Sequence, residues 1–131
     1  MRNKRGMTLI EIMVSVILFV LCIAGVMALI YHSTVASYSV YYTYLATNLA
    51  KNRIEWIREH RANKGYLSLG DLPAEQIDMI DRYGNSGEDF ERTTQVEYSP
   101  EQSKITVMVD FKRREVNVPI KVELVTLLQN Y

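Results

Sequence analysis

Residues 12–30, IMVSVILFVLCIAGVMALI, decide how the N-terminal part of this chain folds. Of these 19 residues only Ser15 and Gly25 fall outside the hydrophobic class. At about 1.5 Å per residue an α-helix of this length spans roughly 29 Å, close to the thickness of the hydrocarbon core of a bilayer. The stretch therefore predicts one membrane-spanning helix.

Basic residues on one side of this stretch predict its orientation. Arg2, Lys4 and Arg5 precede it, and the next basic residue is Lys51. Because loops rich in Lys and Arg stay in the cytoplasm, the N-terminus is expected to be cytoplasmic and the rest of the chain to be exported.

The composition of the whole chain excludes several classes of protein. Its 131 residues include 15 Lys and Arg against 15 Asp and Glu, so the formal charge is zero and a strongly basic nucleic-acid binder is not expected. Cys22 is the only cysteine and there are two histidines, which leaves no intramolecular disulfide and no ligand set for structural zinc.

Two simpler interpretations of the N-terminal stretch stay open. A secretory signal peptide has the same basic start and apolar run, and Val26-Met27-Ala28 would serve as its cleavage site. An ordinary single-span anchor is the other. Against both stands Glu11, a carboxylate beside the run that costs up to about 3 kcal/mol in lipid. Residues 12–50 also lack any formal charge, 39 residues where an anchor needs about 20.

Residues 4–11, KRGMTLIE, resemble the class III leader of type IV prepilins and type II secretion pseudopilins. In that family a basic leader ends in Gly, a prepilin peptidase cuts after it and methylates the new N-terminus, and Glu stands fifth in the mature chain. The resemblance implies a leader of residues 1–6, cleavage between Gly6 and Met7, N-methylation of Met7 and a role in subunit assembly for Glu11. Met7 departs from the commoner first residue, Phe.

A second stretch, residues 46–58 (ATNLAKNRIEWIR), is similar to the A-x-x-L-A-x-x-x-I/L-E-x-x-R pattern of minor members of the family. These are the PilV-type pilus modification proteins and the I-type minor pseudopilin. The Pro found midway along the membrane helix of many major pilins is missing, and so is the cysteine pair that often closes their C-terminal loop. The resemblance therefore implies a minor subunit.

The implied cleavage would create a charge that Glu11 can match. A free or methylated amine at Met7 has an ordinary pKa of about 7.7 to 8.0, so it is largely cationic at neutral pH. In a filament this cation can lie near the Glu11 carboxylate of an adjacent subunit, which offsets the cost of burying either charge. Gly6 suits the cut because a residue without Cβ lets an extended backbone enter a protease cleft.

The pattern and the resemblance agree on an α+β, pilin-like fold, in which one long N-terminal helix packs on a small antiparallel sheet. No Pro or Gly interrupts residues 26–64, so a helix is expected from near Met7 to about Ala62, ended by Gly65 in the left-handed conformation. Residues 7–30 would be its transmembrane part and 31–64 its periplasmic half.

Residues 65–131 are expected to form a globular head with a loop, a short helix at about residues 73–83 and three strands. The predicted strands are residues 93–99, 104–111 and 115–127, and in the last of them one face carries Val116, Val118, Ile120, Val122 and Leu124. Because Pro119 cannot donate a backbone hydrogen bond, this strand is expected to have an exposed edge. The apolar face of the sheet is expected to bury against Leu49, Trp56 and Ile57.

Five tyrosines follow the apolar run: Tyr31, Tyr38, Tyr41, Tyr42 and Tyr44. Tyr favours the boundary between lipid and water, so we interpret them as interfacial anchors and packing groups between subunits rather than as a ligand-stacking strip.

Two polar groups in the head have a functional and a structural interpretation. Asp81, Asn85, Glu88 and Asp89 offer oxygen ligands for calcium, but their spacing fits no EF-hand loop, and a solvated acidic face is expected. Lys112-Arg113-Arg114 would suit DNA phosphates, but three basic residues between strands usually only blunt a turn. Ser68 misses the G-x-S-x-G spacing and glycine-rich phosphate loops are absent, so nothing in the sequence supports an enzyme.

The sequence thus predicts a structural minor pilin or pseudopilin without cofactor, metal or catalytic residues. It would be a single-pass protein of the bacterial inner membrane with its head in the periplasm, and would then join or prime a type IV pilus or a type II secretion pseudopilus. Expected partners are other pilin or pseudopilin subunits, prepilin peptidase and inner-membrane lipid; nucleic acid is not expected. The alternatives are a DNA- or surface-binding tip subunit and a secreted soluble protein cleaved after Ala28.

Overall fold

The computed structural model describes residues 8–112 and 120–130. They form one long helix, a short 3-10 helix and four strands: α1 (Leu9–Lys64), η1 (Tyr66–Leu69), β1 (Glu75–Ile80), β2 (Phe90–Glu97), β3 (Gln102–Phe111) and β4 (Lys121–Gln129). By its internal contacts the chain divides into two compact units, one ending at Ser37 and one beginning at Tyr38.

The single long helix that the sequence predicts is confirmed, with both ends within two residues of the expected ones. At its start the Thr8 carbonyl accepts the N–H groups of Glu11 (3.0 Å) and Ile12 (3.2 Å). At its end the Gly65 N–H donates to the Arg61 carbonyl at 2.8 Å. Gly65 has the positive φ expected of it, 87°, but its ψ of 169° lies outside the left-handed helical region.

This backbone conformation makes Gly65 a sensitive position. A Cβ there would meet no atom within 4 Å, so any cost of Gly65→Ala comes from the backbone alone. Since a φ and ψ of this kind are reached almost only by Gly, we expect the substitution to destabilise the head by about 1–3 kcal/mol. Thermal unfolding of the full chain in a non-ionic detergent, followed by near-ultraviolet circular dichroism, measures the change. Gly25→Ala, a helical glycine with equally open surroundings, should leave this transition unchanged.

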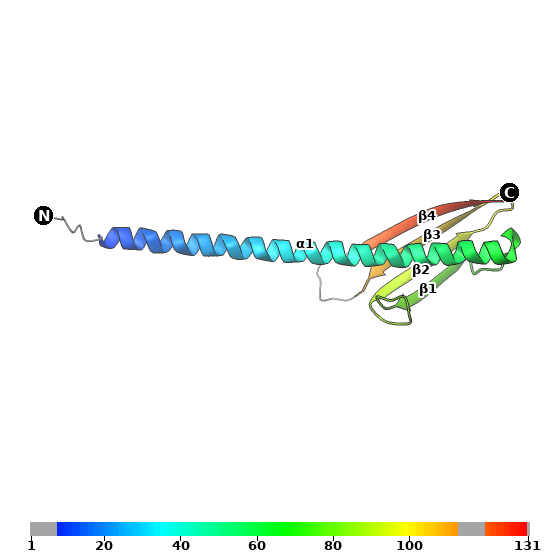
Figure 1. Cartoon of the computed structure of the whole chain (residues 1–131), viewed down its shortest axis with the longest axis horizontal. Helices are drawn as coiled ribbons and strands as arrows, with labels where there is room; N and C mark the ends of the chain where they lie inside the picture. The colour runs from blue at the N-terminus through cyan, green and yellow to red at the C-terminus, as the bar shows by residue number, and fades with distance from the viewer. Residues whose placement is uncertain (1–7, 113–119, 131) are drawn as a thin grey trace. The chain divides into compact units, whose positions relative to one another are not determined.

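The four strands form one antiparallel meander in the order β1-β2-β3-β4. In Figure 1 they lie along the part of α1 that follows Ser37. β2 and β3 confirm two predicted strands, and the register of β3 with β4 runs from Gln102 opposite Gln129 to Asp110 opposite Lys121. The predicted turn residues Arg113 and Arg114 lie outside the described residues, as do Val116, Val118 and Pro119.

The short helix predicted at residues 73–83 is wrong, because this segment contains β1. Residues 75–80 alternate between the two faces of the sheet, and the strand pairs with β2 from Glu75 opposite Gln95 to Ile80 opposite Phe90. The ladder supplies backbone hydrogen bonds that outweigh a weak local helix preference. Gly84, with φ of 86°, lies in the turn between β1 and β2 instead of ending a helix. The sheet therefore has four strands rather than three.

The core of the head lies between α1 and the inner face of this sheet. The buried residues of the helix are Ala46, Leu49, Ala50, Ile54 and Ile57. The largest fully buried side chains of the strands are Phe90, Ile105, Val107 and Val109. Ala46 and Ala50 are small, which lets the helix approach the sheet closely, and the prediction that Leu49 and Ile57 pack in this core is confirmed.

The expectation for Trp56 is wrong, since its side chain is 45% exposed. It precedes the buried Ile57 by one position and so lies beside the buried face of α1. The Arg53 guanidinium lies 4.5 Å from its ring centroid on one side, and the His60 ring stacks on it at 5.3 Å. A cation and a second ring on its faces stabilise an aromatic side chain at the surface.

Candidate functional site

Glu11 lies in the first turn of α1, where backbone N–H groups have no helical carbonyl four residues earlier to donate to. The residues from Thr8 to Glu11 have the T-x-x-E spacing of a capping box, and a carboxylate in the first turn is favoured by the helix dipole. The Glu11 side chain is exposed. It is thus available to a partner, although residues 1–7, which include Gly6 and Met7, lie outside the described residues.

The part of α1 that follows Glu11 is apolar on every side. All residues from 8 to 34 are exposed, including large side chains such as Phe19 (67%) and Leu29 (73%). Of the residues that the structure describes, α1 is the one helix that is long and apolar enough to cross a membrane. A helix that is hydrophobic all round needs lipid or other protein around it.

Two hydroxyl groups in this segment form hydrogen bonds to the backbone of the helix itself. The Ser15 hydroxyl donates to the Glu11 carbonyl at 2.8 Å, and the Thr34 hydroxyl donates to the Ile30 carbonyl at 2.9 Å. Such bonds to the carbonyl four positions earlier pair the hydroxyl donors of Ser15 and Thr34 within the helix. These two polar residues are therefore compatible with lipid.

The first 27 residues match a protein family described as the prokaryotic N-terminal methylation motif. With the long apolar helix and the four-stranded sheet, this match fits a membrane-anchored, single-span protein of pilin-like α+β fold. The motif indicates a type IV pilin-like protein or pseudopilin, supports processing by prepilin peptidase and points to a structural role. Comparison with the curated proteins and with the solved structures gave no match.

The stretch of α1 that resembles minor members of the family, residues 46–58, belongs to the compact unit that begins at Tyr38, which we call the head from here on. Its apolar positions are those buried against the sheet, and the Arg58 guanidinium donates to the Thr126 hydroxyl of β4 at 3.0 Å. Most of this pattern is therefore explained by packing of the helix on its own head.

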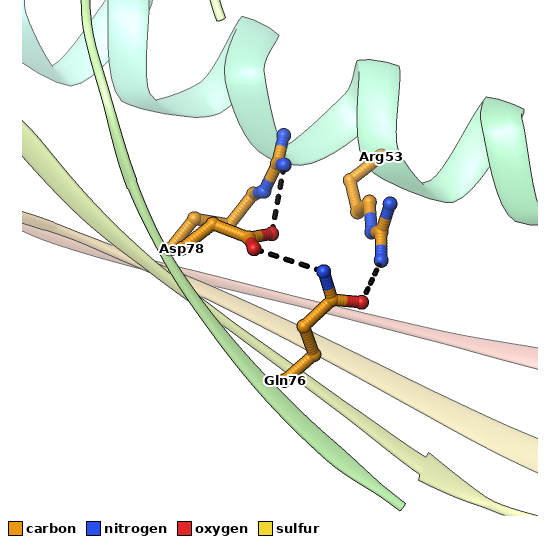
Figure 2. Close-up of polar contacts among 4 residues, drawn as sticks. Arg53, Gln76 and Asp78 are labelled. Carbon is orange, nitrogen blue, oxygen red and sulfur yellow. Dashed lines mark hydrogen bonds and ion pairs between the residues drawn. The ribbon is translucent and has the colours of Figure 1, made fainter. Parts of the chain in front are cut away.

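A second polar site in the head escaped the sequence analysis. The Arg53 guanidinium of α1 donates to the side-chain oxygen of Gln76, whose amide nitrogen donates to Asp78 Oδ1 at 2.8 Å (Figure 2). Arg92 of β2 donates to Asp78 Oδ2 at 3.0 Å. We call these four residues, Arg53, Gln76, Asp78 and Arg92, the arginine cluster. It joins the helix to the sheet edge formed by β1 and β2.

The surroundings of the arginine cluster lower the pKa of Asp78 and also that of Arg53. Burial would raise the pKa of Asp78, but hydrogen bonds from Arg92 and Gln76 and the charges of the two guanidiniums outweigh that effect and lower it below the ordinary 3.8. Burial and the nearby charge of Arg92 lower the pKa of Arg53. The Asp78 carboxylate is thus the anion that holds two close cations in the head.

The lowered pKa of Asp78 predicts how stability depends on pH. A carboxyl whose pKa is lower in the folded state stabilises that state above its unfolded pKa and loses this contribution as pH falls through the folded pKa. We expect Asp78→Asn to lower the free energy of unfolding by roughly 2 kcal/mol at pH 7. The difference from the wild type should be constant near neutral pH and shrink as pH falls below about 4 and through the lowered pKa of Asp78.

Thermal unfolding of the full chain in detergent across this pH range tests the prediction. Asp71→Asn, at an exposed position, is the matched control and should show a small difference at every pH. A pH-independent gap between wild type and Asp78→Asn would contradict the assignment.

Asp81, one of the residues weighed above as a calcium ligand, holds a turn with its side chain. Asp81 Oδ1 accepts the N–H groups of Tyr83 (2.8 Å) and Asn85 (3.0 Å). Burial would raise the pKa of Asp81, but these hydrogen bonds lower it. Within residues 8–112 and 120–130, no three His, Cys, Asp or Glu side chains come together as a metal site.

Two other groups from the sequence analysis are separated by the structure. Lys112 pairs with Glu91 of β2 at 3.2 Å, while the rest of the basic turn lies outside the described residues. Among the five tyrosines, Tyr42 packs within the head, with its ring stacked on Phe111 at 4.3 Å, whereas the other four are exposed. Tyr42 is thus a packing residue of the subunit itself.

Proposed function

We propose that this chain is a minor subunit of a type IV pilus or a type II secretion pseudopilus. In this proposal prepilin peptidase cuts between Gly6 and Met7 and methylates the Met7 amine. Before assembly the mature chain lies in the inner membrane, with its N-terminus in the cytoplasm and its head in the periplasm. It then joins a filament or the complex that primes one.

The observation that carries this proposal is the exposed apolar half of α1, headed by one carboxylate. Residues 8–34 are all exposed in the isolated chain, and Glu11 is the only one of them with a formal charge. In the bilayer these side chains contact lipid, and in a filament they contact the same segments of neighbouring subunits. Since both surroundings are apolar, the exchange costs little in solvation.

Glu11 supplies the specificity that apolar contacts lack. A carboxylate in an apolar bundle needs a cation, and the Met7 amine of an adjacent subunit is the cation that cleavage provides. The pair forms only when subunits are in one axial register. Glu11 therefore sets the position of each incoming subunit.

The minor role is supported by the head. The 46–58 pattern resembles minor members, and the head carries no cysteine that could close a C-terminal loop. The salt bridge between Lys112 and Glu91 neutralises one charge of the basic turn, which weakens the case for a DNA-binding tip subunit.

Fractionation of the producing bacterium tests this proposal. Filaments sheared from wild-type cells should contain the chain in amounts far below the major subunit, and cells lacking prepilin peptidase should keep all of it in the membrane. Free protein in the medium of both strains, starting at Leu29, would support the secreted alternative and contradict the proposal. A chain present at the level of the major subunit would contradict its minor role.

A further inference from the structure

The head contains an open cavity of about 260 Å³ beside the arginine cluster. Arg53, Asn52 and Trp56 of α1 line one side of it, and Arg92 of β2 and Tyr83 of the turn after β1 line another. The residues that line it include two arginines and no Asp or Glu. Asp78, which pairs with Arg92, is not one of them. A cavity with this lining favours an anion.

Both arginines of this cavity keep a buried donor without an acceptor. The Nε atoms of Arg53 and Arg92 are buried and have no hydrogen-bond partner among residues 8–112 and 120–130. Their Nη2 atoms are already used, one on Gln76 and the other on Asp78. These Nε atoms have almost no exposed surface, so a ligand in the cavity would not pair with them, but a negative charge there would stabilise the two incompletely paired guanidinium groups.

The charge count within the arginine cluster limits the kind of anion. Two guanidinium charges against the one carboxylate of Asp78 leave a single positive charge. A monoanionic carboxylate balances it, and its two oxygens match the planar donors of a guanidinium. A phosphate dianion would exceed that charge and approach Asp78.

The rim of the cavity indicates where such a carboxylate comes from. Trp56 and Tyr83 are exposed by 45% and 75%, although both are large aromatic side chains. Exposed Trp and Tyr beside Arg are the residues that most often carry the binding energy of protein interfaces. An open mouth with an aromatic rim suits a side chain that stays attached to a chain outside.

We infer that this cavity binds the carboxylate of an Asp or Glu side chain of a neighbouring protein. The carboxylate lies against the Arg53 and Arg92 side chains, and Asn52, Trp56 and Tyr83 contact the partner chain around it. This site lies in the head and uses no residue of the N-terminal segment, so it stands whether or not Glu11 acts as proposed above.

Trp56 is the only tryptophan in the sequence, so its fluorescence reports directly on the cavity. The experiment uses the full chain in a non-ionic detergent at constant ionic strength. The probe is a capped pentapeptide with a central glutamate, and the control peptide has glutamine in its place. We expect a saturable change in Trp56 emission. The concentration at half-saturation should be about tenfold lower for the glutamate peptide than for the glutamine peptide, since interactions between charged groups are stronger. Sodium acetate, which lacks the attached chain, should bind more weakly.

A variant at the mouth tests the location without disturbing the ion pair. Asn52 is exposed on α1, so Asn52→Asp should fold normally while placing a competing carboxylate at the cavity. It should weaken binding of the glutamate peptide about tenfold. Asn63→Asp, the same change at an exposed helix position outside the cavity, should leave binding unchanged.

Four results would overturn the inference. Equal responses to the glutamate and glutamine peptides would show that the cavity does not recognise a carboxylate. Tighter binding of inorganic phosphate than of the glutamate peptide would show that its ligand is a different anion. If acetate bound as tightly as the glutamate peptide, the chain around the carboxylate would contribute nothing, and the ligand would not be a protein side chain. An unchanged affinity in Asn52→Asp would place the binding elsewhere on the head.

Discussion

We expect Glu11→Gln to lower incorporation of the chain into filaments about 100-fold while leaving leader cleavage intact. The substitution keeps the size and shape of the side chain and removes only its charge. In the proposed filament it leaves the Met7 amine of a neighbour in an apolar core without a counterion. Removing one partner of a buried ion pair costs about 3–5 kcal/mol. Apolar contacts change much less between correctly and incorrectly positioned subunits.

Quantitative immunoblotting of sheared filaments, normalised to the membrane fraction, measures this loss. Glu59→Gln, the same change at an exposed position in the second half of α1, is the matched control and should assemble normally. If Glu11→Gln assembled as well as the control, the register role of this carboxylate would be wrong.

The second large effect is expected at the cleavage position. In Gly6→Arg, a long side chain stands where the proposed substrate must present an extended backbone without Cβ. We expect the processed fraction to fall by about 100-fold, since small displacements of a scissile bond have effects of this size. The full-length precursor should accumulate in the membrane.

Pulse labelling followed by separation of precursor and mature chain measures the effect of Gly6→Arg. Asn3→Ala lies in the same leader and alters neither its charge nor its last residue, so it should be processed at the normal rate. Efficient cleavage of Gly6→Arg at the same bond would show that the peptidase does not read this glycine.

The sequence was sufficient for the long helix and most of the sheet because both rest on periodic patterns. Residues 12–30 leave a helix in lipid as the simplest way to satisfy the backbone, and Leu49, Ile54 and Ile57 recur on one face. In β4 the inward residues Val122 and Leu124 alternate with exposed ones, as expected. Patterns of this kind survive in any tertiary context.

The sequence analysis does not predict the first strand because two of its three inward positions are polar, and only the last, Ile80, is apolar. Gln76 and Asp78 face the helix, so residues 75–80 lack the apolar alternation that identifies a half-buried strand. Their inward orientation becomes favourable only through Arg53 and Arg92, which are distant in sequence. The arginine cluster and β1 therefore depend on each other.

Trp56 illustrates a different limit of sequence reasoning. A large aromatic residue next to Ile57 was assigned to the core by hydrophobicity alone, but the buried stripe of α1 is too narrow to include both. The structure places it on the rim of a cavity beside Arg53. An unexplained tryptophan one position off the buried face of a helix is a signal for a surface site.

The mass of the N-terminal peptide of the mature chain tests the central claim most directly. Purified from cells that contain prepilin peptidase, the chain should begin at Met7 with one additional methyl group on its amine, and from cells without the enzyme it should keep residues 1–6. A chain that begins at Leu29, or that keeps its leader in both strains, would contradict the account.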